Sequence, residues 1–277
     1  MIFCVFALLF LAVPAVQSQE RIALDAFYHS PDGFHLLMPQ GWENLSTDTY
    51  AHFSDPEADV DIYAASVPTE DAQAGIQEAI GLILPDFDGE PSHVSEVILS
   101  NGTWTQEIYR TDDEQYVTAY GQVYDAKTYA VLWSSVRPAQ PVIVSDENVQ
   151  AGITSALATL GYEVNQPTAS EEITVNEQVL TQNVYEATPP ITAIGRVRGE
   201  TTLVMVTTAP LVESDANPLV FFTLLTDFFI TPATTPYLYL GLAATAVIAL
   251  AFIGSLVIRQ RNLQKDLETL ETLQAEA

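Results

Sequence analysis

The stretch VTAYGQVYDAKTYAVL (residues 117–132) is echoed at equal length by ITAIGRVRGETTLVMV (residues 191–206). TWTQEIYR (103–110) precedes the first copy as LTQNVYEA (180–187) precedes the second. In the first copy Ala119, Gly121 and Val123 alternate onto one face of a strand. Their side chains are small enough to let a helix approach this face closely. The match predicts one structural unit present twice. Convergent strand composition, rich in threonine and valine, is the alternative interpretation.

The surrounding sequence switches between a period of two and a period of 3.6, which are typical of strands and helices. A helix is predicted from a cap at Thr69 to a stop before Pro85, with isoleucines at helical spacing. A second is predicted after a cap at Ser145, over 146–160, and a third over 218–230. The predicted fold class is therefore α+β, with antiparallel sheets and packed helices in repeated βββα units.

The segment 218–230 is apolar on nearly all sides, but it is too short to span a bilayer and Asp227 interrupts it. Asn217 and Pro218 suit the start of a helix. Two interpretations stay open: a core helix under a sheet, or a helix resting on the outer leaflet of a membrane.

Residues 237–258 (YLYLGLAATAVIALAFIGSLVI) contain no charge. At about 1.5 Å per residue, this stretch is long enough for a transmembrane helix. Tyr237 and Tyr239 are expected to be interfacial anchors. Arg259, Arg261 and Lys265 follow directly, and the positive-inside rule then places the tail 259–277 in the cytoplasm and the N-terminal region outside.

Residues 1–18 have the apolar core and small-residue end of a secretory signal peptide, with an uncleaved anchor as the alternative. The predicted organisation continues with an extracytoplasmic α+β domain (24–163), a shorter βββα repeat unit (166–231), the span and a helical tail. The expected location is the plasma membrane, crossed once. Small residues at Gly241, Thr245 and Ala249, and leucines at heptad spacing in the tail, favour a homo-oligomer or a membrane-protein partner.

The charge balance is strongly acidic, with 36 Asp plus Glu against nine Lys plus Arg. Such a surface repels phosphate backbones, which excludes nucleic-acid partners. A well-solvated exterior or an adaptation to high salt accounts for the excess of acid. Cys4 is the single cysteine and lies in the leader, so disulfides and thiolate sites are excluded from the mature chain.

The sequence predicts no catalytic residue, metal ligand or cofactor. The four histidines have no partner at ligand spacing, and His29 and His35 are six residues apart, which suits neither a helix face nor a tight turn. Phosphate-binding and hydrolase motifs are absent from the sequence. Arg196 and Arg198 form a rare basic spot, either an anion site, a clamp on the acidic first domain, or ordinary surface residues.

The stretch DGFHLLMPQGW (32–42), with the later helix and long β-meander, resembles the PsbP/Mog1/DcrB-like α/β sandwich domains over about residues 24–163. The resemblance implies a binding or assembly module with no shared catalytic residues. We therefore expect a membrane-anchored extracytoplasmic module without catalytic activity. The alternatives are an accessory structural subunit of a membrane complex, or an enzyme with an unrecognised carboxylate site.

Overall fold

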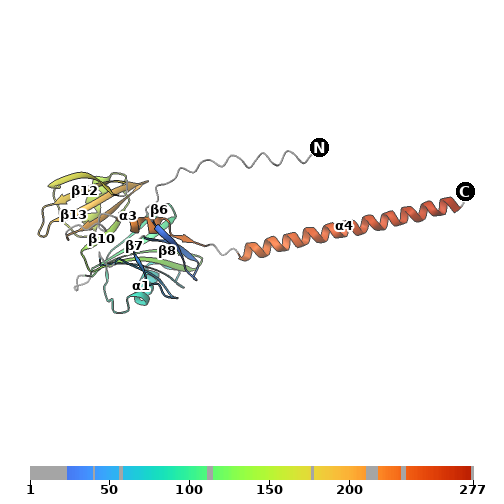
Figure 1. Cartoon of the computed structure of the whole chain (residues 1–277), viewed down its shortest axis with the longest axis horizontal. Coiled ribbons are helices and arrows are strands. Elements are labelled where there is room, and N and C mark those ends of the chain that lie inside the picture. Colours follow the sequence, from blue (N-terminus) through green and yellow to red (C-terminus); the bar gives the residue numbers. More distant parts are fainter. Residues whose placement is uncertain are drawn as a thin grey trace. The chain divides into compact units, whose positions relative to one another are not determined.

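The computed structural model describes residues 24–39, 41–55, 59–110, 115–175, 178–209, 218–231 and 235–275. Its contacts form two compact units, Met1–Ile230 and Thr231–Ala277. The first contains antiparallel sheets with packed helices, and the second is one long helix, so the predicted α+β class is confirmed (Figure 1). The predicted signal peptide lies outside the described residues.

The larger sheet has seven antiparallel strands in the order β3-β4-β5-β9-β8-β7-β6. These strands are β3 (Glu43–Asn44), β4 (Ala51–Asp55), β5 (Val60–Val67), β6 (Pro91–Leu99), β7 (Gly102–Arg110), β8 (Tyr116–Tyr124) and β9 (Lys127–Ser135). Helix α1 (Ala72–Ile83) packs on one face of β8 and β9. Its cap is Asp71, two residues after the predicted Thr69, because the Asp71 carboxylate accepts the Ala74 N–H at 2.8 Å.

The second sheet has five antiparallel strands in the order β10-β14-β13-β12-β11. These strands are β10 (Ala139–Val144), β11 (Ala169–Val175), β12 (Gln178–Tyr185), β13 (Ile191–Arg198) and β14 (Thr201–Thr207). Helix α2 (Val149–Thr159) packs on β13 and β14. Its cap is Asn148, which accepts from two backbone N–H groups, and not the predicted Ser145.

Both sheets follow one plan, in which a strand, a helix and a four-stranded meander come in that order. β5, α1 and β6–β9 build one copy, and β10, α2 and β11–β14 build the other, with the same strand order in each sheet. The helix that covers each meander thus precedes it, whereas the predicted βββα order places it after the strands. The reason is the connection between strands. In the first copy, β5 pairs with β9, the last strand of the meander, whereas the chain continues from β5 to β6 at the opposite edge. Helix α1 joins these two strands and therefore crosses the meander before it in the sequence.

The two copies also repeat their closest contacts. A Cβ added at Gly75 would lie 2.3 Å from Thr128, and one at Gly152 would lie 2.4 Å from Thr202. The hydroxyls of both threonines donate to backbone carbonyls before the helix, Thr128 to Thr69 and Thr202 to Asp146, at 2.7 Å in each case. A duplicated unit, as the sequence predicts, would account for these matching contacts.

Strand β10 and helix α2 precede residue 163, yet they pack with β11–β14. Hydrogen bonds join β10 to β14 over six residue pairs, from Ala139↔Thr207 to Val144↔Thr202. In the structure, the second sheet therefore begins at Ala139, inside the range that the sequence analysis assigned to the first domain.

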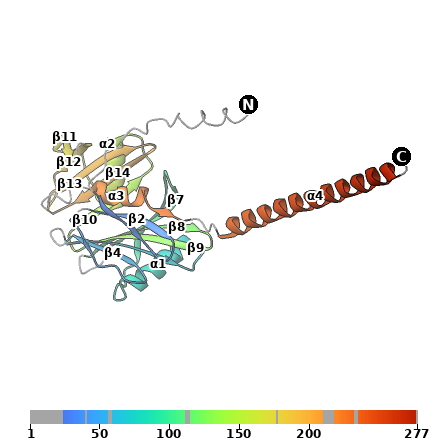
Figure 2. The same ribbon diagram turned by 45° about the vertical axis from the view of Figure 1, so that its right-hand side comes forward.

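Helix α3 (Pro218–Thr226) lies between the two sheets (Figure 2). Phe221, Phe222 and Leu225 are fully buried, and the ring of Phe221 contacts those of Tyr120 and Trp133 at 5.5 Å between centroids. Of the two interpretations of this apolar segment, the core helix agrees with the structure. Burial of these large rings supplies much of the apolar contact between the sheets.

A third sheet of three strands, β1 (Leu24–His29), β2 (Phe34–Pro39) and β15 (Phe229–Ile230), has the order β1-β2-β15. Phe34 and Leu36 point into the central core. The alternating residues of β1 and β2 must then point outward. This outward side carries the candidate site.

The second compact unit is helix α4 (Thr235–Ala275). Its segment Tyr239–Lys265 is long and apolar enough to cross a membrane. Arg259, Arg261 and Lys265 continue the same helix and are exposed, as is Tyr239. The side chain of Tyr237 lies outside the described part of the helix.

Candidate binding face on the β1–β2–β15 sheet

The β1–β2 hairpin brings His29 opposite His35. The turn is fixed by hydrogen bonds from Ser30 N–H to Phe34 O at 2.9 Å and from Gly33 N–H to Ser30 O at 3.1 Å. Gly33 has a φ of 88°, which glycine adopts without a steric penalty. Because the 30/34 pair is hydrogen-bonded, the adjacent 29/35 pair is a non-hydrogen-bonded pair, where side chains come closest.

The two imidazoles meet edge to face. Their Nδ1 atoms lie 2.5 Å apart, and the ring centroids are 4.5 Å apart at an interplanar angle of 76°. From their spacing in the sequence, these histidines were not expected to meet, because a separation of six residues suits neither a helix face nor a tight turn. A hairpin brings residues i and i+6 opposite each other, and the Asp32–Gly33 turn signal between them was the available clue.

Two phenylalanines stack on the histidine pair: Phe229 on β15 lies beside His35 across the sheet, and Phe27 precedes His29 by two residues on β1. Phe27 stacks on His29 at 6.3 Å and 24°, and Phe229 stacks on His35 at 6.1 Å and 21°. Phe27 and Phe229 are 57% and 56% exposed. We call these four side chains (Phe27, His29, His35 and Phe229) the aromatic row. Large apolar rings that share one exposed surface are typical of binding sites.

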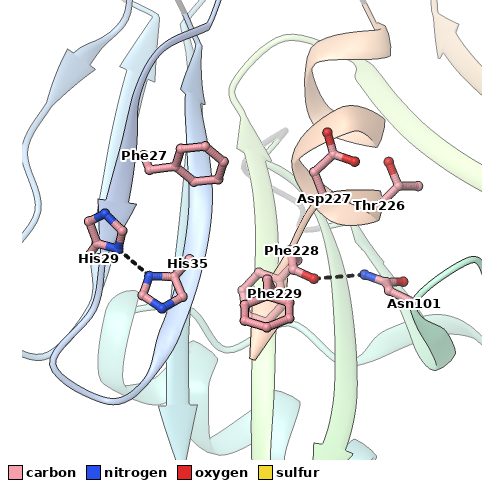
Figure 3. A pocket seen from close by; sticks show the side chains of 8 residues that line it. All are labelled: Phe27, His29, His35, Asn101, Thr226, Asp227, Phe228 and Phe229. Atoms are coloured by element: carbon pink, nitrogen blue, oxygen red, sulfur yellow. Dashed lines mark hydrogen bonds between the residues drawn. The ribbon is translucent and has the colours of Figure 1, made fainter. Parts of the chain in front are cut away.

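An open pocket of about 570 Å³ adjoins the aromatic row (Figure 3). Its lining comes from β1, β2, the turn before β7, and the segment from the end of α3 into β15. The lining residues are Phe27, His29, His35, Asn101, Thr226, Asp227, Phe228 and Phe229. Apolar walls with few polar groups are the usual composition of a small-ligand or peptide site.

Asn101 fixes the far wall of this pocket. Its side-chain amide donates to Leu225 O at 2.9 Å and to Phe228 O at 3.1 Å, and its Oδ1 accepts from Trp104 Nε1 at 3.0 Å. Asn101 also belongs to an Asn-Gly-Thr glycosylation sequon. In the folded protein both amide protons are engaged, so this residue holds the α3–β15 connection against the β6–β7 hairpin.

His35 is partly buried, whereas His29 is exposed. Burial, followed by the nearby charge of His29, lowers the pKa of His35 below its usual value. His35 is therefore a neutral imidazole at neutral pH, and a neutral imidazole carries one nitrogen lone pair that can accept a hydrogen bond or bind a metal. His52 instead bonds Asp61 at 2.7 Å on β4 and β5, away from this pair.

The predicted basic spot lies on β13. The Arg198 guanidinium donates to Thr226 Oγ1 at 2.7 Å, and Thr226 in turn donates to Phe222 O at 2.8 Å. Arg198 thus ties the second sheet to the end of α3, next to the pocket wall. Arg196, two residues earlier on the same strand, is partly buried. The interpretation of both as an anion site stays a prediction.

Glu107 is a buried carboxyl that the sequence analysis did not single out. It is 0% exposed, faces α1, and accepts a hydrogen bond from the hydroxyl of Tyr109. Burial raises the pKa of Glu107; Asp71 adds to this effect, and the Tyr109 hydrogen bond opposes it. At the matching place of the second copy, Asn183 bonds Tyr185 at 3.1 Å, so a neutral amide replaces the carboxyl there.

Glu107→Gln is expected to stabilise the protein at neutral pH by about 1–3 kcal/mol, the usual range for a buried polar group without full compensation. A carboxyl with a raised folded-state pKa binds more protons when folded, so its contribution to stability is complete at acid pH. That contribution is lost as pH rises through the folded-state pKa. Chemical unfolding of both proteins from pH 4 to pH 8 should show a difference that vanishes at the acid end; a constant difference would contradict this reason.

A scan against models of protein families and a comparison with curated proteins give no match. Among solved structures, the chain is similar to the solution structure of cyanobacterial PsbP (CyanoP) from Synechocystis sp. PCC 6803. The two share 16% identity, and the alignment covers 42% of this chain and 82% of the other with a TM-score of 0.32. A likeness of this size carries no argument about function.

Proposed function

We propose that this chain is a membrane-anchored extracytoplasmic module that binds a partner through the aromatic row and its pocket, without catalytic activity. The observation that carries the proposal is the position of this face in the chain. Phe229 lies on β15, whose last residue, Ile230, ends the folded unit, and a helix suited to span a membrane begins at Thr235. A strand that carries an exposed ring therefore leads almost directly into the span.

The connection between Ile230 and Thr235 limits where the partner is found. Five residue steps reach at most about 18 Å. Because the same chain carries the aromatic row and the span, a neighbouring membrane protein is the class of partner that we propose.

The distribution of charge supports the proposed orientation. Arg259, Arg261 and Lys265 follow the uncharged stretch, and the part before the span holds six basic and 32 acidic residues. Cations next to a span favour the cytoplasmic side. The proposed location is the plasma membrane, crossed once, with Tyr237 and Tyr239 at the outer interface.

The test is co-purification of the full-length chain from membranes in mild detergent. In the variant Phe27→Ser/Phe229→Ser, a companion present at fixed stoichiometry should be retained at least about tenfold less, because the few aromatic anchors that dominate an interface cost about 2 kcal/mol or more when truncated. Ile98→Ser is the matched control, since Ile98 is 68% exposed on β6 and does not line the pocket. Equal recovery with both variants would contradict the proposal.

A second candidate function is a structural subunit that associates through its span. Gly241, Thr245 and Ala249 recur every fourth residue of α4, and the Thr245 hydroxyl is satisfied by Gly241 O at 2.8 Å. This leaves a smooth, small-residue surface suited to close helix contact, in a homo-oligomer or with another membrane protein. Replacing 237–258 by an unrelated span would abolish the association in this case and preserve it in the first.

A further inference from the structure

The histidine pair presents two nitrogen ligands at one point. Two imidazole nitrogens bound to one ion, each at about 2.0–2.1 Å, are separated by about 3 Å in ordinary coordination angles. The Nδ1 atoms of His29 and His35 face each other at 2.5 Å. One Nδ1 donates a hydrogen bond to the other in the metal-free pair. Binding of a shared ion would replace this hydrogen bond, with the Nδ1 proton moved to Nε2 of the same ring and the two nitrogens separated to about 3 Å.

The two rings are also held in place before any ligand arrives. The turn hydrogen bonds of Ser30 and Gly33 fix the register of the hairpin, and β15 pairs Phe229 directly with His35. Phe27 stacks on His29, and Phe229 stacks on His35. Because the ligands are already ordered, binding costs little conformational entropy.

We propose that His29 and His35 bind one divalent late first-row transition-metal ion, with Cu²⁺ held more tightly than Ni²⁺ or Zn²⁺. Imidazole nitrogen suits these ions, whereas Mg²⁺ and Ca²⁺ prefer oxygen. The order of affinity follows from the general order of stability of such complexes. This inference is independent of the proposed function, since the metal binds with or without a protein partner.

The site is open on its pocket side. Among the described residues, no group of three or more His, Cys, Asp or Glu side chains is placed to hold an ion. Water, or a donor atom of a molecule in the pocket, would complete the coordination. A structural zinc site, in contrast, is closed by four protein ligands.

The competing source of cation binding is the acidic surface, because carboxylates collect cations without a specific site. The test therefore uses full-length protein purified in detergent through a tag without histidine, and titrates it with Cu²⁺, Ni²⁺ or Zn²⁺ in excess Mg²⁺. We expect one tight Cu²⁺ per chain, whose electron paramagnetic resonance spectrum shows coupling to two imidazole nitrogens.

Three variants distinguish binding by the histidine pair from binding by surface carboxylates. His29→Gln and His35→Gln should each weaken Cu²⁺ binding at least about tenfold, the loss that even an outer-shell partner commonly causes. His93→Gln should leave binding unchanged, since His93 lies on β6 outside the pair. Equal binding by wild type and the His29→Gln/His35→Gln variant, or a spectrum without imidazole nitrogen, would overturn the proposal and assign the binding to surface carboxylates.

Discussion

Gln106→Leu is expected to lower the free energy of unfolding by about 3 kcal/mol or more. Gln106 is 1% exposed and sits on β7, where it faces β10 of the other sheet. Its amide donates to Ile143 O at 3.3 Å and its Oε1 accepts the Ile143 N–H at 2.9 Å. The side chain thus bonds to both backbone groups of Ile143, as a neighbouring strand would.

Leucine has a similar volume but no polar atoms, so it leaves both groups of Ile143 buried and unpaired. The Tyr120 hydroxyl, which donates to Gln106 Oε1 at 2.6 Å, loses a partner as well. Each such group costs about 1–3 kcal/mol. Urea unfolding in detergent, followed by the fluorescence of the buried Trp104 and Trp133, measures the loss.

The second copy supplies the control. Gln182 occupies the matching place on β12, but it is only partly buried and its amide bonds the exposed Glu171 at 3.2 Å. Gln182→Leu should change the free energy of unfolding by less than about 0.5 kcal/mol. Equal effects of the two substitutions would show that Gln106 does not connect the sheets.

Gly75→Ala and Gly152→Ala form the second large prediction, each lowering the free energy of unfolding by about 1–3 kcal/mol. The new methyl groups would lie 2.3 Å and 2.4 Å from the Cβ atoms of Thr128 and Thr202. Neither threonine can move away easily, because its hydroxyl is bonded to the backbone before the helix. The helix must therefore shift off the sheet.

Gly81→Ala is the control within helix α1, because it adds the same methyl group away from the sheet. Nothing lies within 4 Å of a methyl group at this exposed position. Alanine should stabilise the helix there by up to about 1 kcal/mol, its ordinary advantage over glycine. A destabilising Gly81→Ala, or neutral Gly75→Ala and Gly152→Ala, would contradict close helix–sheet packing as the reason for the glycines.

Most of the local structure, and some of the packing, could be predicted from the sequence. The strand face with small side chains at Gly121 was predicted to pack against a helix. In the structure, a Cβ added at Gly121 would lie 2.7 Å from Ile76 of α1, and one added at Gly195 would lie 2.8 Å from Ile153 of α2. The pairing of β10 with β14 was not predicted. Periodicity describes one segment at a time, whereas that pairing joins residues more than fifty positions apart.

The candidate site was missed for a related reason. The spacing of His29 and His35 is uninformative until the turn between them is recognised as a hairpin, and Phe229 joins them only through β15. Conversely, Arg198 was noticed for its charge, but its observed role is a hydrogen bond to α3. A charged residue in a sequence carries no indication of which neutral group it will meet.

Labelling of single cysteines in intact cells tests the central claim, a folded unit outside the membrane and a tail inside. Cys4 is the single cysteine, so a Cys4→Ser chain carries no thiol, and one is then added by Ser155→Cys on α2 or by Asn262→Cys in the tail, both at exposed positions. A membrane-impermeant maleimide should modify residue 155 in intact cells and residue 262 only after permeabilisation. Modification of residue 262 in intact cells, with residue 155 protected, would contradict the anchored extracytoplasmic module.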